Sequence, residues 1–320
     1  MSRDRICVLS GGTGTPKLLQ GLVNLVDPEK LDVIVNTADD VWVGDLYVSP
    51  DIDTVLYTLA GIVDQEKWYG IRGDTYRVYE ARKRKGLDDI LRLGDRDREL
   101  VSLRTSLMAQ GMPLSEAVRE QCTALGIRQR VWPMSDQSVQ TYIHTPVGEM
   151  EFQEFWVRRG GRDRILGIIF RGIDEARICS GAEAALRSAR AVIIGPSNPV
   201  TSIGPIIRTA GVVDLLRQTR VVAVSPLKRG AVFSGPAGKM LRALGLEVSP
   251  VSIAELYREF LDAILIDSED AELRPVLEKG YGVEVHTCSL EMRTQSDKFK
   301  LARAALAAAT EGETVGRRSR

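Results

Sequence analysis

Short apolar runs alternate with amphipathic stretches along most of the chain. The runs at residues 5–10 and 31–36 predict buried parallel strands, and residues 16–26 predict a helix with its leucines on one face. Later apolar runs predict further strands within residues 190–199, 220–230, 263–270 and 282–289. Residues 239–250 predict a helix followed by a strand. This alternation favours an α/β fold with a doubly wound, Rossmann-like parallel sheet.

The middle of the chain departs from this alternation. Residues 65–180 contain charged helical stretches followed by alternating strand patterns, which predict a mostly helical insertion and a β-hairpin. We expect this insertion to form a lid on the substrate side. The predicted core then consists of residues 1–64 and 181–305. The polar run "TEGETVGRRSR" predicts a disordered tail, which we place at residues 306–320.

The composition excludes several classes of protein. The 320 residues include 43 Lys or Arg and 43 Asp or Glu, so the net charge indicates neither a nucleic-acid partner nor a membrane partner. No apolar run approaches the ~20 residues of a membrane span, and the N-terminus does not resemble a signal peptide. Four scattered cysteines and two distant histidines predict no disulfide framework or zinc site. We therefore expect a soluble, cytoplasmic protein.

A glycine-rich loop follows the first predicted strand. It contains Gly11, Gly12, Thr13, Gly14, Thr15 and, after a proline, Lys17. The spacing matches neither a Walker A loop nor a dinucleotide fingerprint. Backbone N–H groups at such a helix start bind phosphate or pyrophosphate. The alternative is a tight structural turn, with Lys17 on the surface.

Acidic residues follow the second predicted strand. Asp39 and Asp40 come directly after it, and Asp51 and Asp53 come just before a helix expected near Thr54. A helix cap would explain one of the later acids but not all four. Carboxylates beside a phosphate loop favour Mg²⁺, which takes oxygen ligands together with substrate phosphates.

Three further segments are candidates for binding. Residues 194–206 form a polar loop rich in glycine and proline, where Ser197 and Asn198 suit a phosphate or ribose, although Thr201 or Ser202 could instead cap a helix. Residues 224–240 resemble a second anion-binding loop. Residues 91–100, "LRLGDRDREL", could face a ligand or form a lattice of surface ion pairs.

Six motifs occur in an order that resembles one family, the 2-phospho-L-lactate transferases. They are "GGTGTPKLL", "VNTADDVWV", "SPDIDTVLY", "RLGDRD", "GPSNPVTSIGP" and "SGPAGKM", and the resemblance covers residues 5–290. It implies a Mg²⁺-dependent enzyme of deazaflavin coenzyme biosynthesis. The donor would be lactyl-2-diphospho-5′-guanosine or its enolpyruvyl analogue. The acceptor would be the ribityl hydroxyl of the deazaflavin Fo, and GMP would be released.

The resemblance also implies roles for individual residues. Asp53 and Arg92 match the Fo-binding positions, and Asp39 and Asp51 match the metal and catalytic positions, with Asp53 orienting or deprotonating the hydroxyl. The nucleotide would bind the loop at residues 11–17, Lys17 included, and Ser197 and Asn198. Members of the family are homodimers.

Two other functions compete with this one. Proteins of the same fold bind a nucleotide-sugar and regulate metabolism without transferase chemistry, and they share the glycine loop and the "PSNP" loop. The "SPDIDTVLY" and "RLGDRD" motifs favour the transferase. A nicotinamide-dependent dehydrogenase would need a third glycine at position 17 and an acid about 20 residues further on.

Overall fold

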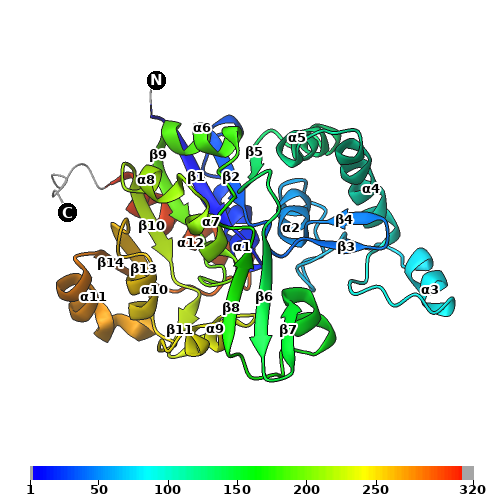
Figure 1. The fold of residues 1–320 in the computed structure, drawn as a ribbon. Coiled ribbons are helices and arrows are strands. Elements are labelled where there is room, and N and C mark those ends of the chain that lie inside the picture. Colours follow the sequence, from blue (N-terminus) through cyan, green and yellow to red (C-terminus); the bar gives the residue numbers. More distant parts are fainter. Residues whose placement is uncertain (1–2, 312–320) are drawn as a thin grey trace.

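The computed structural model describes residues 3–311, and a seven-stranded parallel sheet lies at its centre (Figure 1). The strand order is β14-β13-β10-β9-β1-β2-β5. The strands are β1 (Arg5–Ser10), β2 (Leu31–Val35), β5 (Arg130–Pro133), β9 (Ala189–Ile194), β10 (Arg220–Val224), β13 (Ala263–Asp267) and β14 (Glu284–Cys288). This order confirms the predicted doubly wound, Rossmann-like fold.

Helices cover both faces of the sheet because side chains alternate between its faces. On β1, Ile6 and Val8 belong to one hydrophobic core, and Cys7 and Leu9 belong to the other. The first core is covered by α1 (Gly14–Leu22), α2 (Pro50–Leu59), α5 (Leu114–Ala124) and α12 (Gln295–Thr310). The second is covered by α6 (Ser180–Ser188), α7 (Ile203–Arg208), α8 (Val212–Leu216), α9 (Ala237–Ala243), α10 (Pro250–Leu256) and α11 (Arg274–Tyr281).

The predicted insertion at residues 65–180 is wrong in one respect, because it contains a strand of the central sheet. β5 pairs in parallel with β2, with Arg130 opposite Asp32. The strand has only four residues and ends in a proline, so its pattern is too short to recognise. The helices α3 (Arg77–Arg84) and α4 (Asp95–Ala109) precede it, as predicted from the charged stretches.

A small antiparallel sheet follows β5 and confirms the predicted hairpin. It has the order β7-β6-β8, from β6 (Gln140–Thr145), β7 (Gly148–Glu151) and β8 (Gly167–Arg171), and a π-helix, η2 (Glu154–Arg158), joins β7 to β8. Figure 1 shows this sheet standing apart from the central one. Two-stranded ribbons and short helices complete the fold: β3 (Val41–Val43), β4 (Leu46–Val48), β11 (Leu227–Lys228), β12 (Ala231–Val232), η1 (Pro28–Lys30) and η3 (Ser268–Leu273).

Three predicted boundaries are corrected. The first helix begins at Gly14 rather than residue 16, and no strand follows α9 within residues 239–250. The tail does not begin at residue 306, because α12 continues to Thr310 and buries alanines against the sheet. The rest of that prediction, residues 312–320, lies outside the described residues.

The helices α1 and α12 pack in close contact. A Cβ atom on Gly21 would lie 2.3 Å from the carbonyl oxygen of Lys298, so only glycine allows this approach. Within residues 3–311, no helix has both the length and the apolar character needed to cross a bilayer.

Candidate active site

A cavity of about 770 Å³ opens where β1 and β9 lie side by side at the carboxyl ends of the strands. The chain after β1 leads to α1 on one face, and the chain after β9 leads to α7 on the other. Such a switch point leaves a crevice in which ligands of open α/β sheets bind. Loops after β1, β2, β9, β10 and β14 line the cavity, together with residues from α2, α4 and the segment at η2.

The glycine loop lies against the loop that follows β9. A Cβ atom on Gly14 would lie 1.9 Å from the carbonyl oxygen of Pro196, and one on Gly11 would lie 2.6 Å from Cβ of Ser202. Gly12 has a φ of +55°, which favours glycine. The predicted structural turn is therefore real, because the glycines allow two loops to pack together.

The same loop also presents the start of α1 to the cavity. Gly12, Thr13 and Gly14 line it, and Thr13, at the N-cap position, makes no side-chain cap hydrogen bond. The first turn of α1 carries no acidic residue. Helix N-termini attract anions through their N–H groups and dipole, so this end of the cavity suits a phosphate. The packing role and the phosphate role are thus compatible.

Ser197 and Asn198 line the cavity as predicted, but their side chains hold the loops together. The Ser197 hydroxyl accepts a hydrogen bond from the Gly11 N–H (3.2 Å) and lies 2.6 Å from Oγ1 of Thr15. Asn198 Oδ1 accepts from the Val200 N–H (3.0 Å). The alternative of a helix cap is not realised, since Ser202 at the N-cap of α7 makes no side-chain cap bond.

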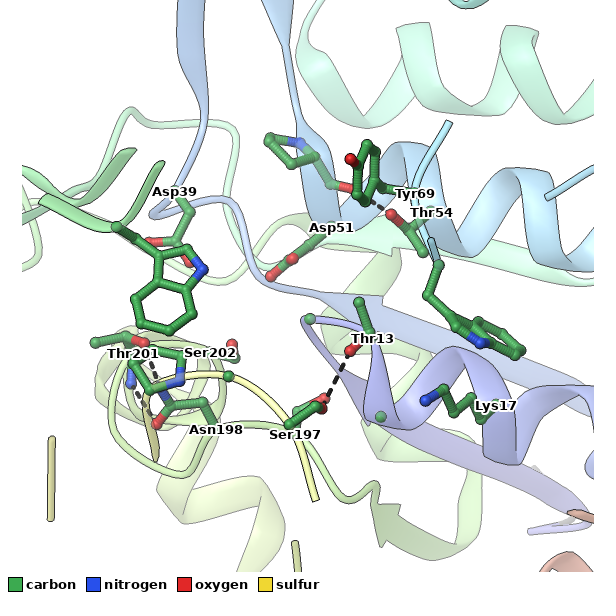
Figure 2. Close-up of a pocket in the computed structure, with 18 of the residues that line it drawn as sticks. Thr13, Lys17, Asp39, Asp51, Thr54, Tyr69, Ser197, Asn198, Thr201 and Ser202 are labelled. Atoms are coloured by element: carbon green, nitrogen blue, oxygen red, sulfur yellow. Dashed lines mark hydrogen bonds between the residues drawn. The ribbon is translucent and has the colours of Figure 1, made fainter. Parts of the chain in front are cut away.

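Two of the predicted acids form a pair in the cavity beside these loops (Figure 2). The Nδ2 of Asn36 donates to Oδ2 of Asp39 (3.2 Å) and to Oδ2 of Asp51 (3.0 Å). The sequence analysis did not single out Asn36. Its position directly after β2, ahead of the first two acids, is the signal that could have identified it.

Burial and mutual repulsion make this pair costly to ionise. Burial, and next the charge of Asp51, raise the pKa of Asp39 well above its usual range. Burial also raises the pKa of Asp51, while hydrogen bonds from Asn36 and the Gly12 N–H act in the opposite direction. Oδ1 of Asp39 is buried without a hydrogen-bond partner. A cation beside the pair would offset these costs.

The carboxylates of Asp39 and Asp51 fit a Mg²⁺ ion whose remaining ligands come from the substrate. Mg²⁺ is usually held by one or two carboxylates plus waters and phosphate oxygens. Within residues 3–311, no group of three or more His, Cys, Asp or Glu side chains is placed to hold a metal on its own. The buried pair and the unpartnered oxygen of Asp39 therefore suit a cation that arrives with a phosphate ligand.

The remaining two acids have other surroundings. Asp53 lines the cavity, but the fully buried guanidinium of Arg104 donates to both of its oxygens, at 2.6 and 3.0 Å. Asp40 does not line this cavity and accepts a hydrogen bond from the Ser49 hydroxyl. The helix α2 begins at Pro50, so neither Asp51 nor Asp53 is its N-cap residue.

Arg92 and the segment around it reach the cavity from beside α4. The Arg92 guanidinium lies 4.1 Å from the Tyr76 ring centroid and pairs with Glu80 at 3.3 Å. Arg92 and Asp97 both line the cavity, whereas Arg96 does not. A lattice of surface ion pairs therefore does not describe the whole segment, because two of its charged residues line the cavity.

Lys17 is not a simple surface lysine. It lines the cavity half-buried, with its ammonium 5.0 Å from the Trp68 ring centroid, and burial lowers its pKa. Figure 2 shows it on α1 beyond Thr13, away from the two acids. In the other anion-binding segment, the Lys239 ammonium donates to the Gly161 carbonyl and thereby ties α9 to the η2 region.

Sequence reasoning missed the aromatic part of the cavity lining. Six aromatic residues contribute: Tyr57, Trp68, Tyr69, Phe152, Trp156 and Phe233. The loop after β14, residues 290–293, also lines the cavity. These residues gave no local signal, since single aromatic residues are common in cores. Flat apolar walls beside polar loops suit a ligand with ring systems.

The sequence was compared with protein families and with curated proteins, and both comparisons point to one family. Residues 6–304 match the family model described as 2-phospho-L-lactate transferase CofD. The chain is 48% identical over 301 residues to the 2-phospho-L-lactate transferase of Methanothermobacter thermautotrophicus, covering 94% of this chain and 97% of that one. It is 45% identical over 302 residues to that of Methanocaldococcus jannaschii, covering 93% and 96%.

A solved structure supports the fold alone. A protein of the UPF0052 family from Bacillus halodurans superposes with a TM-score of 0.63 at 19% identity, covering 96% of this chain and all of that one. The family match spans the glycine loop, the acid pair and the loop after β9, which together form the cavity. The chain therefore belongs to the 2-phospho-L-lactate transferase family, whose named members transfer phospholactate.

Proposed function

We propose that the chain transfers the 2-phospholactyl group, or its enolpyruvyl analogue, from lactyl-2-diphospho-5′-guanosine to the ribityl hydroxyl of Fo, 7,8-didemethyl-8-hydroxy-5-deazariboflavin. GMP is the second product, and the reaction depends on Mg²⁺. The observation that carries the proposal is the Asp39–Asp51 pair, which lines the same cavity as the N-terminus of α1 and meets that loop where Asp51 accepts a hydrogen bond from the Gly12 N–H. A cation held by the two carboxylates beside an anion-binding helix start suits a diphosphate.

The diphosphate would bind between these two elements. Backbone N–H groups at residues 13–15 would donate to phosphate oxygens, while the Gly12 N–H keeps its hydrogen bond to Asp51, and Lys17 would add positive charge to the same wall. Ser197 and Asn198 would act mainly by fixing the shape of the opposing loop, because their side chains are already hydrogen-bonded within the protein. Asp39 and Asp51 would hold Mg²⁺, which would neutralise the diphosphate and the charge that develops on departing GMP.

The acceptor would bind at the other end of the cavity. Asp53, Arg92 and Tyr69 all line the cavity. Asp53 would accept a hydrogen bond from a ribityl hydroxyl while Arg104 holds it in place. The hydroxyl oxygen attacks the phosphorus that bears the lactyl group, and the bond from this phosphorus to the GMP oxygen breaks. Such phosphoryl chemistry depends mainly on positioning and charge neutralisation.

The direct test is product formation. The protein is incubated with Fo, either donor and Mg²⁺, and mass spectrometry monitors phospholactyl-Fo and GMP. We expect product that disappears when EDTA removes Mg²⁺ and falls at least about 100-fold in Asp39→Asn. No product from the wild-type protein with either donor would contradict the proposal. Tight binding of a UDP-sugar without Fo binding would instead favour a regulatory nucleotide-sugar-binding protein.

The expected homodimer is a separate proposal. Light scattering would measure the molar mass in solution, and a mass of twice 35.3 kDa is the expected result. A mass of one chain at assay concentration would contradict it.

A further inference from the structure

A buried carboxylate outside the predicted set lines the cavity near Asp53, where we place the acceptor. Asp97 lies in the first turn of α4 and is only 6% exposed. Its Oδ1 accepts a hydrogen bond from the Tyr57 hydroxyl (2.7 Å). Its backbone N–H donates to Oδ2 of Asp74 (3.0 Å), which fixes the start of the helix. The position of Asp97 is therefore set from two sides.

The second oxygen of Asp97 is available to a ligand. Among residues 3–311, no group donates a hydrogen bond to Oδ2 of Asp97. This oxygen lies 3.9 Å from the place that a Cβ atom on Gly70 would take, and Gly70 also lines the cavity. Since Gly70 has no side chain, nothing from this residue covers the oxygen. A hydroxyl at this end of the cavity could reach it.

The other carboxylates at the site have other partners. Both oxygens of Asp53 accept hydrogen bonds from the Arg104 guanidinium. Asp39 and Asp51 share the Asn36 amide and face the anion-binding loops. Asp97 combines a fixed position, a free oxygen and a place in the cavity lining.

We propose that Oδ2 of Asp97 is the proton acceptor for the attacking hydroxyl, and this inference rests on the proposed function. The hydroxyl proton passes to Asp97 while its oxygen forms the new bond to phosphorus. The bond between that phosphorus and the GMP oxygen breaks, and GMP leaves with the electron pair. Asp97 then loses the proton to solvent after product release. Asp53 and Arg104 position the acceptor rather than take the proton.

The charged groups around Asp97 suit this role. Asp53 and Tyr57 face it from α2, Asp74 faces it from the preceding loop, and Arg104 lies on its own helix. Burial, and next the charge of Asp53, raise the pKa of Asp97 to about 7, while the Tyr57 hydrogen bond lowers it. A general base is most effective when its pKa lies near the working pH.

The test compares four variants by the pH dependence of kcat/KM for phospholactyl-Fo formation. The variants are Asp97→Asn, Asp97→Glu, Tyr57→Phe and the control Asp95→Asn. Asp95 lies in the same helical turn but does not line the cavity. For the wild type we expect kcat/KM to rise with pH, and the midpoint of this rising limb of the profile should lie near pH 7. Asp97→Asn should lose about 100- to 10,000-fold in kcat and lack the limb, because general base catalysis contributes that much.

The other variants separate proton transfer from structural effects. Tyr57→Phe removes a hydrogen bond that favours ionised Asp97, so the limb should move to higher pH. Asp97→Glu should recover part of the activity together with the limb, and Asp95→Asn should keep both. An Asp97→Asn protein that retains the limb would overturn the inference while leaving the proposed function intact. A wild-type protein that forms no product would overturn the proposed function, and the inference with it.

Discussion

Asp51 and Asp53 lie two residues apart in the first turn of α2, yet their surroundings differ completely. Positions two apart on a helix point about 200° apart, toward nearly opposite sides. Asp51 faces Asn36 and Gly12 beside another carboxylate, whereas Asp53 meets a fully buried guanidinium. One carboxylate is left with repulsion that a ligand can relieve. The other is already neutralised by the protein.

This difference separates a binding role from a structural role. A buried carboxylate paired with arginine contributes to stability only while both partners are present. A buried carboxylate beside a second carboxylate costs stability until a cation or proton arrives. We therefore expect substitutions in the two surroundings to have opposite effects on folding and on activity.

The largest expected effect follows from removing the guanidinium. Arg104→Met leaves Asp53 buried without its partner, so the free energy of unfolding should fall by about 3–5 kcal/mol. Urea unfolding followed by circular dichroism measures this loss. Arg92→Met is the matched control: Arg92 is more than half exposed, and we expect a change below about 1 kcal/mol. Equal losses in the two variants would contradict the structural role of Arg104.

The next effect concerns the acid pair. Asp51→Asn removes the repulsion with Asp39, so unfolding stability should stay equal or rise slightly. Turnover should nevertheless fall at least about 100-fold, because a charge on the Mg²⁺ site is lost. Urea unfolding and the Mg²⁺ dependence of turnover measure the two effects separately. Normal turnover with normal Mg²⁺ dependence would show that the pair is not the metal site.

Stability should also depend on pH through Asp97. Its folded pKa of about 7 exceeds the ordinary 3.8, so the folded state binds a proton that the unfolded state releases between these values. The stabilisation is complete below pH 3.8 and is lost as the pH rises toward 7, by an amount on the order of 4 kcal/mol. Thermal unfolding of wild type and Asp97→Asn across this window would reveal the difference. Parallel pH profiles would contradict it.

The smallest expected effect is the difference in unfolding stability between substitutions at two glycines. Gly14→Ala places a Cβ atom 1.9 Å from the Pro196 carbonyl oxygen, so about 1–3 kcal/mol of stability should be lost as the two loops move apart. Gly280→Ala in α11 is the control, since nothing lies within 4 Å of its added Cβ atom. That change should stabilise the protein by up to about 1 kcal/mol. Urea midpoints that shift in the same direction would contradict this expectation.

The sequence predicted those parts of the site that follow strands. The loops after β1, β2 and β9 could be expected to meet, because parallel strands carry their carboxyl ends to one edge. Arg104 could not be predicted, since it reaches Asp53 across 51 residues from the middle of a helix with other charged residues. Asp97 was visible only as one charge among several. Its burial depends on tertiary packing against α2 rather than on its neighbours in the chain.

The fold prediction failed where local patterns were weak. β5 is short, and a long helical segment separates it from the strand with which it pairs. The end of α12 was misjudged because its last residues before Thr310 are mostly alanines, which give no strong apolar stripe. Both errors concern elements whose stability comes from contacts with distant parts of the chain.

The contact between α1 and α12 has a consequence for the order of synthesis. The helix that presents its N-terminus to the cavity emerges early from the ribosome, but its packing partner is the last described helix. Domains fold when their distant segments become available, so the cavity cannot reach its final shape until α12 has been made. Until α12 has been made, α1 therefore lacks this packing partner, and we expect ligand to bind the cavity only once α12 is in place.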